Sequence, residues 1–250
     1  MSLLSLAVTA SVLLAASSLA APLAVAKVAP GDLKCAVQPY DNAWRWTVVF
    51  PDGQVKTQGI WSDHLELTNV DGREVLKRVQ GMSYVSGLSM VLITTADPHT
   101  CTPFSVERHT VGGEVIKRRF AGRKIITERT GPGGVVRSTA VDVAAPVFDF
   151  GDGQEALLLT SLPLRVGYEA MIASIDETSS SDSLKPVTIR VLREETVRDL
   201  RHLPAKAFVV ESDDPGQSRS IFWISKAAPY FLRLEVEFPD NRYRLIFNQI

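Results

Sequence analysis

Length, composition and charge narrow the class of protein. The chain has 250 residues, of which 45% are hydrophobic and 22% charged, an ordinary globular composition that one β-rich domain can accommodate. Its 27 basic and 28 acidic residues leave a formal net charge of -1, so no overall field draws it to nucleic acid or to an anionic membrane. We therefore expect no nucleic-acid partner.

The first 26 residues carry no charge and are typical of an exported protein. An apolar run ends in small residues, and Ala24, Val25 and Ala26 form a cleavage site, with a second one at residues 17–20. A single membrane anchor is the alternative, because no basic residue precedes the run and its length approaches a membrane span. We predict a signal peptide over residues 1–26, cleaved at residue 20 or 26, and a periplasmic or extracellular domain over 27–250 that is not an integral membrane protein.

The two cysteines, Cys35 and Cys101, agree with export. An even number of cysteines in an exported chain favours one disulfide. Two free buried thiols are the alternative, because the sequence does not show that the two residues are close in space. We expect the disulfide.

The first strands are marked by alternation of apolar and polar residues. From Trp44 the apolar side chains recur at every second position, which places them on one face of a strand. The residues 51–54 (PDGQ) then turn the chain into a hairpin. Further along, Asp71 and Glu74 have the spacing of a helix capping box, but Asp71-Gly72 between β-rich flanks is also a hairpin signal, and we favour the hairpin.

The middle of the chain is predicted to continue as a β-meander with one helix. The expected strands are at 84–94, 103–110, 114–120, 123–129, 134–143, from 168, and at 187–193, 205–211 and 218–225. Residues 152–162 predict the helix, with Asp152 as its cap, Glu155 three residues later and Pro163 as its stop. The Ser-rich residues 176–186 are expected to form a mobile loop. The fold class is therefore mainly β, as one large curved antiparallel sheet or incomplete barrel with one short helix.

The last 30 residues predict a hairpin with a defined register. One face should carry Leu232, Leu234, Val236 and Phe238, opposite Arg233, Glu235 and Glu237. The expected cross-strand pairs are Phe238 with Tyr243, Glu237 with Arg244, Val236 with Leu245 and Leu234 with Phe247.

The strand before this hairpin, residues 221–225 (IFWIS), differs from it. Ile221 and Trp223 point one way and Phe222 and Ile224 the other, so both faces are apolar and both should be covered. The cover could be a helix, curvature of the sheet or a ligand.

The residues that could support chemistry are few. Ser89 lies in "GLSMV", which lacks the second glycine of a nucleophile elbow. His99, Cys101 and His109 match no short zinc motif. The adjacent carboxylates Glu194 and Glu195, and Asp213 and Asp214, point to opposite faces or lie in turns. We predict no catalytic residue, no metal and no cofactor.

Two glycine-rich or basic segments have ordinary explanations. Residues 131–134 (GPGG) are expected to form a turn and not a phosphate loop. Residues 117–129 place six basic residues in one hairpin, which could contact lipid headgroups or a polyanion. The expectation is a solvated outer sheet face.

Three phrases in the chain, at 97–109, 157–170 and 222–238, resemble a family of exported bacterial β-rich proteins of unknown function. The residues that fit its pattern are Asp97, Thr100, Pro103, Leu162, Pro163, Leu164, Gly167, Tyr168, Trp223 and Ile224. That family is distantly similar in architecture to periplasmic lipoprotein-carrier proteins, in which an incomplete barrel surrounds an apolar interior. The resemblance implies a fold and bears on function by analogy alone.

These observations lead to three hypotheses for function. The first is a non-catalytic envelope protein that binds or shields a lipid or acyl chain, with Phe222, Trp223, Ile224 and Tyr168 as ligand-facing candidates. The second is a structural or protein-interaction module of the envelope, and the third a hydrolase whose site the sequence does not reveal. An empty apolar cavity would support the first, and an interior filled with side chains the second.

Overall fold

The computed structural model describes most of the mature chain as one large sheet and a short helix. The described residues are 26–28, 33–87, 89–143, 147–148, 155–175, 184–198, 203–228, 230–240 and 242–250. The predicted signal segment up to residue 25, the helix cap Asp152 and residues 176–183 of the predicted loop lie outside them.

The strands and the helix follow one another along the chain with short connections. They are β1 (Ala26–Val28), β2 (Tyr40–Val49), β3 (Val55–Val70), β4 (Arg73–Tyr84), β5 (Ser89–Ala96), β6 (Pro103–Thr110), β7 (Val115–Ala121), β8 (Lys124–Thr130), β9 (Val136–Asp142), α1 (Glu155–Ser161), β10 (Glu169–Ile175), β11 (Leu184–Arg198), β12 (Pro204–Asp214), β13 (Ser218–Ser225), β14 (Phe231–Glu237) and β15 (Arg244–Gln249).

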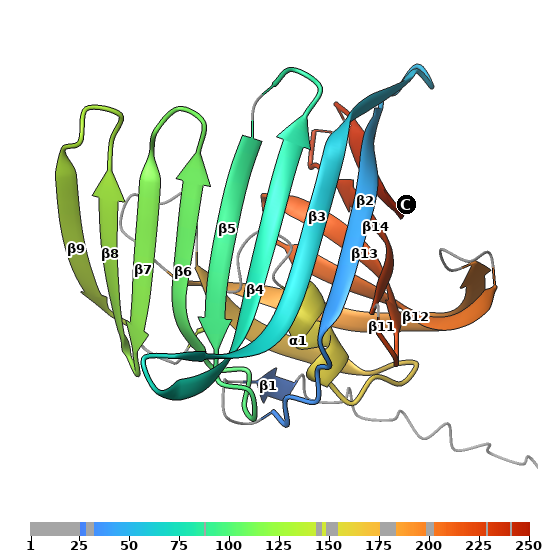
Figure 1. Ribbon diagram of the computed structural model, residues 1–250. Helices are drawn as coiled ribbons and strands as arrows, with labels where there is room; N and C mark the ends of the chain where they lie inside the picture. Colours follow the sequence, from blue (N-terminus) through green and yellow to red (C-terminus); the bar gives the residue numbers. More distant parts are fainter. Residues whose placement is uncertain are drawn as a thin grey trace, which may run out of the picture.

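All fifteen strands belong to one open sheet built from two meanders. Its order is β1-β10-β11-β12-β13-β14-β15-β2-β3-β4-β5-β6-β7-β8-β9, so the last strand of the chain pairs with β2 and joins the two meanders. Every pair is antiparallel except β1 with β10. In Figure 1 the sheet curls so that β11 and β12 cross at a steep angle to the upright strands β3 to β9, with α1 near the bottom of the curl. The predicted mainly β, incomplete-barrel fold is confirmed.

The predicted hairpins are confirmed with two differences. Asp71 and Gly72 both have positive φ, 52° and 81°, the conformation of a tight two-residue hairpin turn. The segment predicted as one strand at 84–94 is instead a turn, because β4 ends at Tyr84, Gly87 adopts a φ of 87°, and β5 begins at Ser89. The short parallel strand β1 was not predicted.

The main hydrophobic core lies between the two meanders. It combines inward side chains of β2 and β3 with those of β11 to β15, and the helix adds Leu157, Leu158 and Leu159, each no more than 1% exposed. The predicted helix is therefore confirmed over Glu155–Ser161, where it contacts β13 and fills part of the curl.

The two ends of the sheet meet by packing of side chains. Ile125 of β8 and Ile175 of β10 are buried in one apolar cluster with Val143 and Val147. No strand pairing joins β9 to β10 among the described residues; the link there is the backbone N–H of Phe148, which donates to the carbonyl of Ala173 at 3.1 Å. We call this contact between the sheet ends the seam.

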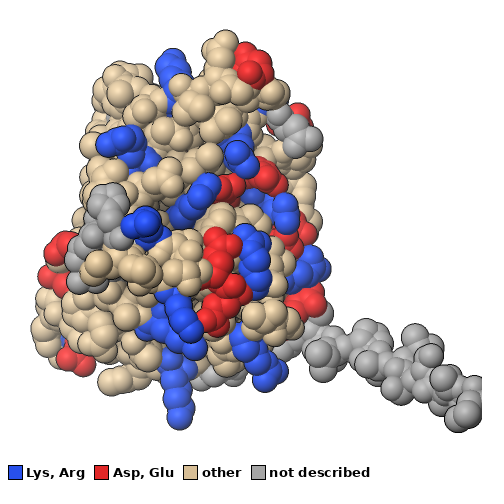
Figure 2. Space-filling model, turned by 90° about the vertical axis from the view of Figure 1, so that its right-hand side faces the viewer, with Lys and Arg blue, Asp and Glu red and all other residues tan. Residues whose placement is uncertain are grey.

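The outer face of the C-terminal meander carries a ladder of ion pairs. The carboxylate of Glu211 lies between Arg190 and Arg219, which also contact Glu169 and Glu237, respectively. Figure 2 shows acidic and basic side chains interleaved on the face it views. Opposite charges on neighbouring strands balance one another, so this face carries no single-sign field.

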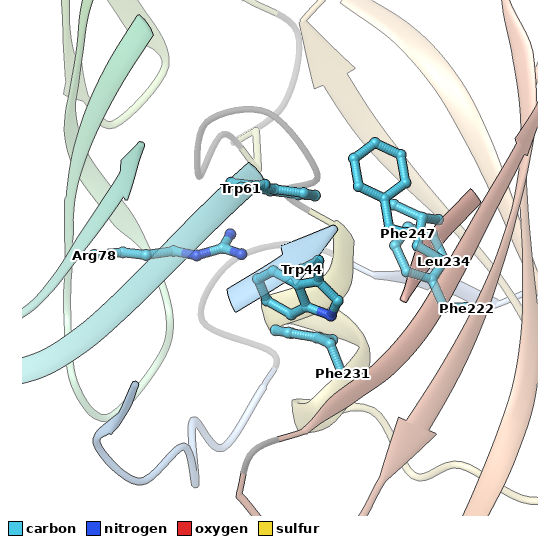
Figure 3. Close-up of a pocket in the computed structure, with 7 residues that line it drawn as sticks. All are labelled: Trp44, Trp61, Arg78, Phe222, Phe231, Leu234 and Phe247. Atoms are coloured by element: carbon cyan, nitrogen blue, oxygen red, sulfur yellow. The ribbon is translucent and has the colours of Figure 1, made fainter. Parts of the chain in front are cut away.

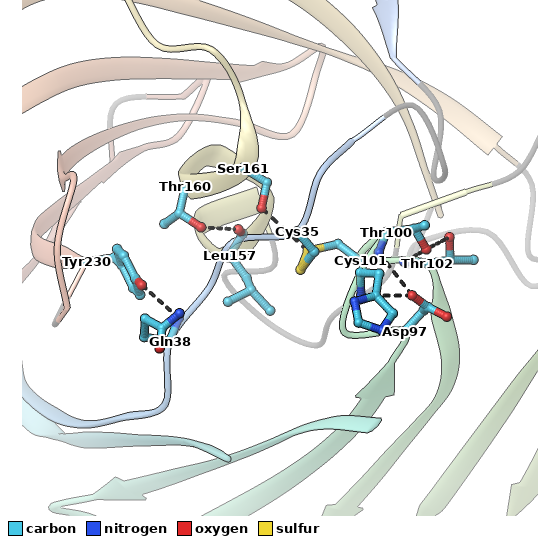
Figure 4. Close-up of a disulfide and its surroundings, with 11 residues drawn as sticks. Cys35, Gln38, Asp97, Thr100, Cys101, Thr102, Leu157, Thr160, Ser161 and Tyr230 are labelled. Atoms are coloured by element: carbon cyan, nitrogen blue, oxygen red, sulfur yellow. Dashed lines mark hydrogen bonds between the residues drawn. A yellow bond between two sulfur atoms is a disulfide. The ribbon is translucent and has the colours of Figure 1, made fainter. Parts of the chain in front are cut away.

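The disulfide between Cys35 and Cys101 is formed, with their Cα atoms 5.2 Å apart (Figure 4). Cys101 lies in a tight turn in which the carboxylate of Asp97 accepts the backbone N–H groups of His99 and Thr100 at 2.9 and 3.0 Å. The N–H of Cys35 donates to the carbonyl of His99 at 2.8 Å. The bridge ties the segment before β2 to the β5–β6 connection, and the predicted disulfide is confirmed.

Candidate functional site

The candidate site is a group of aromatic side chains at the centre of the curl. They line a cavity of about 10 Å³, room for about one water molecule, together with an aliphatic residue and an arginine. The lining residues are Trp44, Trp61, Arg78, Phe222, Phe231, Leu234 and Phe247 (Figure 3). The ring centroids of Trp44 and Trp61 are 5.2 Å apart, and Phe247 lies edge-on to Trp61 at 5.3 Å.

The pairing of β15 with β2 brings these rings together. Leu234 pairs with Phe247, and Phe247 pairs with Trp46, so the inward residues of β14, β15 and β2 lie side by side. The predicted register of the last hairpin is confirmed, with Glu237 opposite Arg244, Val236 opposite Leu245 and the rings of Phe238 and Tyr243 5.0 Å apart. Alternation alone thus built one wall of the aromatic centre.

A β-bulge in β14 corrects one predicted orientation. Trp223 pairs with Arg233 and Ile224 with Phe231, which leaves Leu232 as the extra residue. Leu232 consequently packs on the outer face beside Trp223, and Phe231 takes the inward position in the aromatic centre. The expectation that Leu232 shares a face with Leu234 was wrong because strict alternation takes no account of a bulge.

The four ligand-facing candidates do not share one site. Phe222 lines the cavity, and Ile224 is buried in the same core. Trp223 lies on the outer face, where its indole N–H donates to Glu195 and the Arg233 guanidinium lies 4.8 Å from its ring. Tyr168 packs half-buried against the main core, and burial raises the pKa of its hydroxyl. Both faces of residues 221–225 are covered, as expected, but by protein side chains.

Arg78 is the charged residue of the aromatic centre. It is 2% exposed and forms a buried ion pair with Asp63, with Nε 2.9 Å from Oδ1 and Nη2 2.5 Å from Oδ2. The hydroxyl of Tyr40 donates to Asp63 at 3.0 Å, and burial raises the pKa of that hydroxyl, which keeps it protonated. Nη1 of Arg78 has no hydrogen-bond partner in the part of the chain that the structure describes.

Arg78 begins a row of polar side chains across the inner face of the sheet. Cross-strand pairs run from Arg78 to Thr94, Val106, Arg118 and Thr127 on β4 to β8. Arg78, Thr94, Arg118 and Thr127, which we call the inner polar row, are each no more than 3% exposed. Within the described residues the hydroxyls of Thr94 and Thr127 make no hydrogen bond. Each such buried group costs about 1–3 kcal/mol of stability.

Further arginines lie on the same face towards the hairpin tips. Arg108, Ile116, Arg129 and Arg137 pair in sequence across β6 to β9. We call Arg108, Arg118, Arg129 and Arg137 the inner arginine cluster. The carboxylates of these strands belong to outward residues, where Glu107 contacts Lys117 and Glu128 contacts Arg119.

The basic hairpin 117–129 is therefore divided between the two faces of the sheet. Lys117, Arg119 and Lys124 are exposed on the outer face, as expected, but Arg118 and Arg129 point inward. The expectation of a solvated outer face holds for three of its residues and is wrong for Arg118, which is 3% exposed. Strand alternation at Arg118 between two outward basic neighbours contained that signal.

The other candidates for chemistry lie apart from one another. Cys101 is in the disulfide, His109 contacts Glu107, and no group of three or more His, Cys, Asp or Glu residues able to hold a metal occurs among the described residues. Ser89 begins β5 at an exposed position. Asp214 forms an ion pair with Lys185 at 2.6 Å.

The sequence missed the buried pair of Asp63 and Arg78. Both residues stand at inward positions of strands whose apolar alternation was otherwise read correctly. A charged residue on the apolar side of two strands joined by one hairpin was the signal that could have found them.

Comparison with known proteins agrees with the fold. Among solved structures the chain is similar to a β-barrel-like protein of a domain of unknown function, DUF1849, from Brucella abortus, with a TM-score of 0.53 and 10% identity, covering 85% of this chain and 95% of that one. At this identity the similarity concerns the fold. No family model and no curated protein sequence matches the chain.

The class that the fold defines is an open, barrel-like β-sheet protein with an aromatic centre. The resemblance to a β-rich domain of unknown function is supported at the level of the fold. Within the described residues, no helix has the length and apolar character needed to cross a bilayer.

Proposed function

We propose that this chain is a non-catalytic, exported envelope protein that binds an amphipathic molecule, a lipid or acyl chain, on the inner face of its curled sheet. The observation that carries the proposal is that Arg78 and five aromatic rings line the same cavity. Aromatic and aliphatic walls with one convergent charged group are the usual composition of a site for an apolar ligand with a polar end. Export is proposed from residues 1–26 and agrees with the disulfide.

The energetics of Arg78 favour a ligand over a merely structural interior. Asp63 satisfies Nε and Nη2 of the guanidinium, but Nη1 makes no hydrogen bond within the described residues. A buried N–H without a partner costs about 1–3 kcal/mol, which an apolar residue at this position would avoid. A carboxylate or other polar end of a ligand would satisfy it.

The cavity of about 10 Å³ is too small for an acyl chain, so binding requires the inner side chains to move apart. The seam offers a place for this movement. There the two ends of the sheet are joined by the apolar cluster around Ile125 and Ile175 and by the hydrogen bond from Phe148. Apolar contacts without a strand ladder can part without breaking a row of backbone hydrogen bonds.

The filled aromatic centre is the specific observation in favour of the second candidate function, a structural or protein-interaction module of the envelope. An interior packed at ordinary density leaves the outer surface and the hairpin tips to contact a partner. This candidate predicts that no amphipathic ligand enters the curl.

Tryptophan quenching by a stearate brominated in mid-chain separates the two candidates. Bromine quenches an indole on contact, and Trp44 and Trp61 line the cavity whereas Trp223 lies outside. We expect quenching of the native protein that is largely lost in Trp44→Phe/Trp61→Phe and unchanged in Trp223→Phe. Absence of quenching, or an equal loss in both variants, would show that no chain reaches the aromatic centre.

A further inference from the structure

We infer that the inner arginine cluster, Arg108, Arg118, Arg129 and Arg137, binds a phosphate group. This inference deepens the proposed function, because it assigns the charged end of the amphipathic ligand to a phosphate. It rests on the placement of four cationic side chains on one face of β6 to β9, with the carboxylates of those strands on the opposite face.

The register brings the four guanidinium groups within reach of one anion. Neighbouring strands lie about 4.8 Å apart, and directly opposite side chains are about 5 Å apart at their Cβ atoms. Arg129 stands directly opposite Arg137, and Arg118 is two residues along β7 from Ile116, the cross-strand partner of both Arg108 and Arg129. Long arginine side chains from these positions can converge on a single phosphate.

The opposition of Arg129 and Arg137 is itself informative. Like charges directly across an antiparallel pair destabilise the sheet. An anion with more than one negative charge between them turns this repulsion into attraction. The outer face of the same strands shows the usual arrangement, because Arg119 there contacts Glu128 at 3.3 Å.

The residue types fit a phosphate in particular. The planar guanidinium donates two parallel hydrogen bonds to phosphate oxygens, and all four members of the cluster are arginine. Thr127, paired directly with Arg118, is 1% exposed, and its hydroxyl makes no hydrogen bond within the described residues. That hydroxyl can donate to a phosphate oxygen held by Arg118.

The exposure of the cluster is graded from the edge strand inward. Arg137 on β9 is exposed, Arg108 and Arg129 are partly exposed, and Arg118 is 3% exposed. Cationic side chains that lead into a low-dielectric interior focus the field and raise the local concentration of anions. An anion can thus first contact Arg137 at the open edge of the sheet and then approach Arg118.

The inner polar row connects this cluster to the aromatic centre. Arg118 on β7 and Arg78 on β4 are three strands apart on one row, about 14 Å at the usual strand spacing. A ligand with its phosphate at Arg118 can therefore lay its apolar chain towards the rings around Arg78.

Calorimetric titration with three probes tests the assignment. The probes are lauroyl glycerol phosphate, the uncharged monolauroyl glycerol, and inorganic phosphate. The inner variant is Arg129→Gln/Arg137→Gln, and the matched outer variant, with the same change of charge, is Lys117→Gln/Arg119→Gln. We expect the native protein to bind the phosphorylated lipid at least about tenfold more tightly than the uncharged one. The inner variant should lose this preference, and the outer variant should keep it within about twofold.

Each outcome separates the site from the proposed function. Equal binding of both lipids by the native protein, or an equal loss in the inner and outer variants, would overturn the phosphate site while lipid binding stands. Binding of inorganic phosphate that the inner variant abolishes, without binding of either lipid, would support the site, assign it to a free phosphate compound and contradict the proposed function. Circular dichroism of both variants establishes that they fold.

Discussion

Arg78 and Asp63 form a buried ion pair on the inner face of the β3–β4 hairpin, with the Tyr40 hydroxyl as a third member. Their side chains are 2% and 0% exposed. Burial opposes the charge on Arg78, but Asp63 outweighs it and the pKa of the guanidinium is raised, so the pair stays ionised. A charged group thus stands at the wall of an otherwise apolar cavity.

Removing one partner of this pair should be strongly destabilising. In Asp63→Asn the guanidinium of Arg78 keeps its charge and loses its counter-ion, which typically costs about 3–5 kcal/mol. Urea unfolding should show this loss. Asp41→Asn, a removal of an exposed carboxylate that faces the same hairpin, is the control and should change the stability by no more than about 0.5 kcal/mol. Equal stability of the two variants would contradict the buried pair.

Gly59 should tolerate no side chain. A Cβ there would lie 1.9 Å from the carbonyl oxygen of Ser83 and 2.9 Å from Nε1 of Trp46. We expect Gly59→Ala to cost about 1–3 kcal/mol or more, because backbone must move. Gly81→Ala is the matched control on the neighbouring strand, where the nearest atom is the movable hydroxyl of Ser62 at 2.8 Å. Thermal unfolding that ranks Gly81→Ala as the more damaging change would refute the packing described for Trp46.

Reduction of the Cys35–Cys101 disulfide should lower stability by roughly 4 kcal/mol in the chain-entropy model, because the bridge closes a loop with a sequence separation of 66. The measurement is urea unfolding with and without reductant. Cys35→Ala/Cys101→Ala provides the comparison without thiols and should match the reduced protein. A reductant that leaves the native midpoint unchanged would argue against the bridge.

His64 should titrate above its usual range. The hydrogen bond from Asp41, at 2.5 Å, and the nearby Glu66 raise the pKa of the imidazole above 6.5. Since the folded pKa is the higher one, this stabilisation is complete below about pH 6.5 and disappears as the pH rises through the folded pKa. In an NMR titration, Asp41→Asn should bring the pKa of His64 down towards 6.5. An unchanged pKa would show that Asp41 does not set it.

The sequence predicted the strands and the last hairpin well because those features depend on local alternation and turn residues. Asp71-Gly72 fixed one hairpin, and the pairing of Leu234 with Phe247 followed from counting across one turn. The bulge at Leu232 escaped prediction because it depends on the fit between β13 and β14.

The candidate site was less predictable than the fold. Of the residues proposed as ligand-facing, Phe222 lines the cavity, but Trp44, Trp61 and Arg78 come from strands more than 140 residues away in the chain. Their meeting depends on the pairing of β15 with β2, which no local pattern specifies. The inner position of Arg118 follows from alternation, but its relation to Arg78 required the register of four strands.

Native mass spectrometry of the protein purified from the envelope of its own cells tests most directly whether the curled sheet binds an amphipathic ligand. We predict an added mass that corresponds to a phosphate-bearing lipid and that is lost in Arg129→Gln/Arg137→Gln. Protein that is repeatedly empty, and that also stays empty after incubation with lauroyl glycerol phosphate, would contradict ligand binding and favour an interaction module.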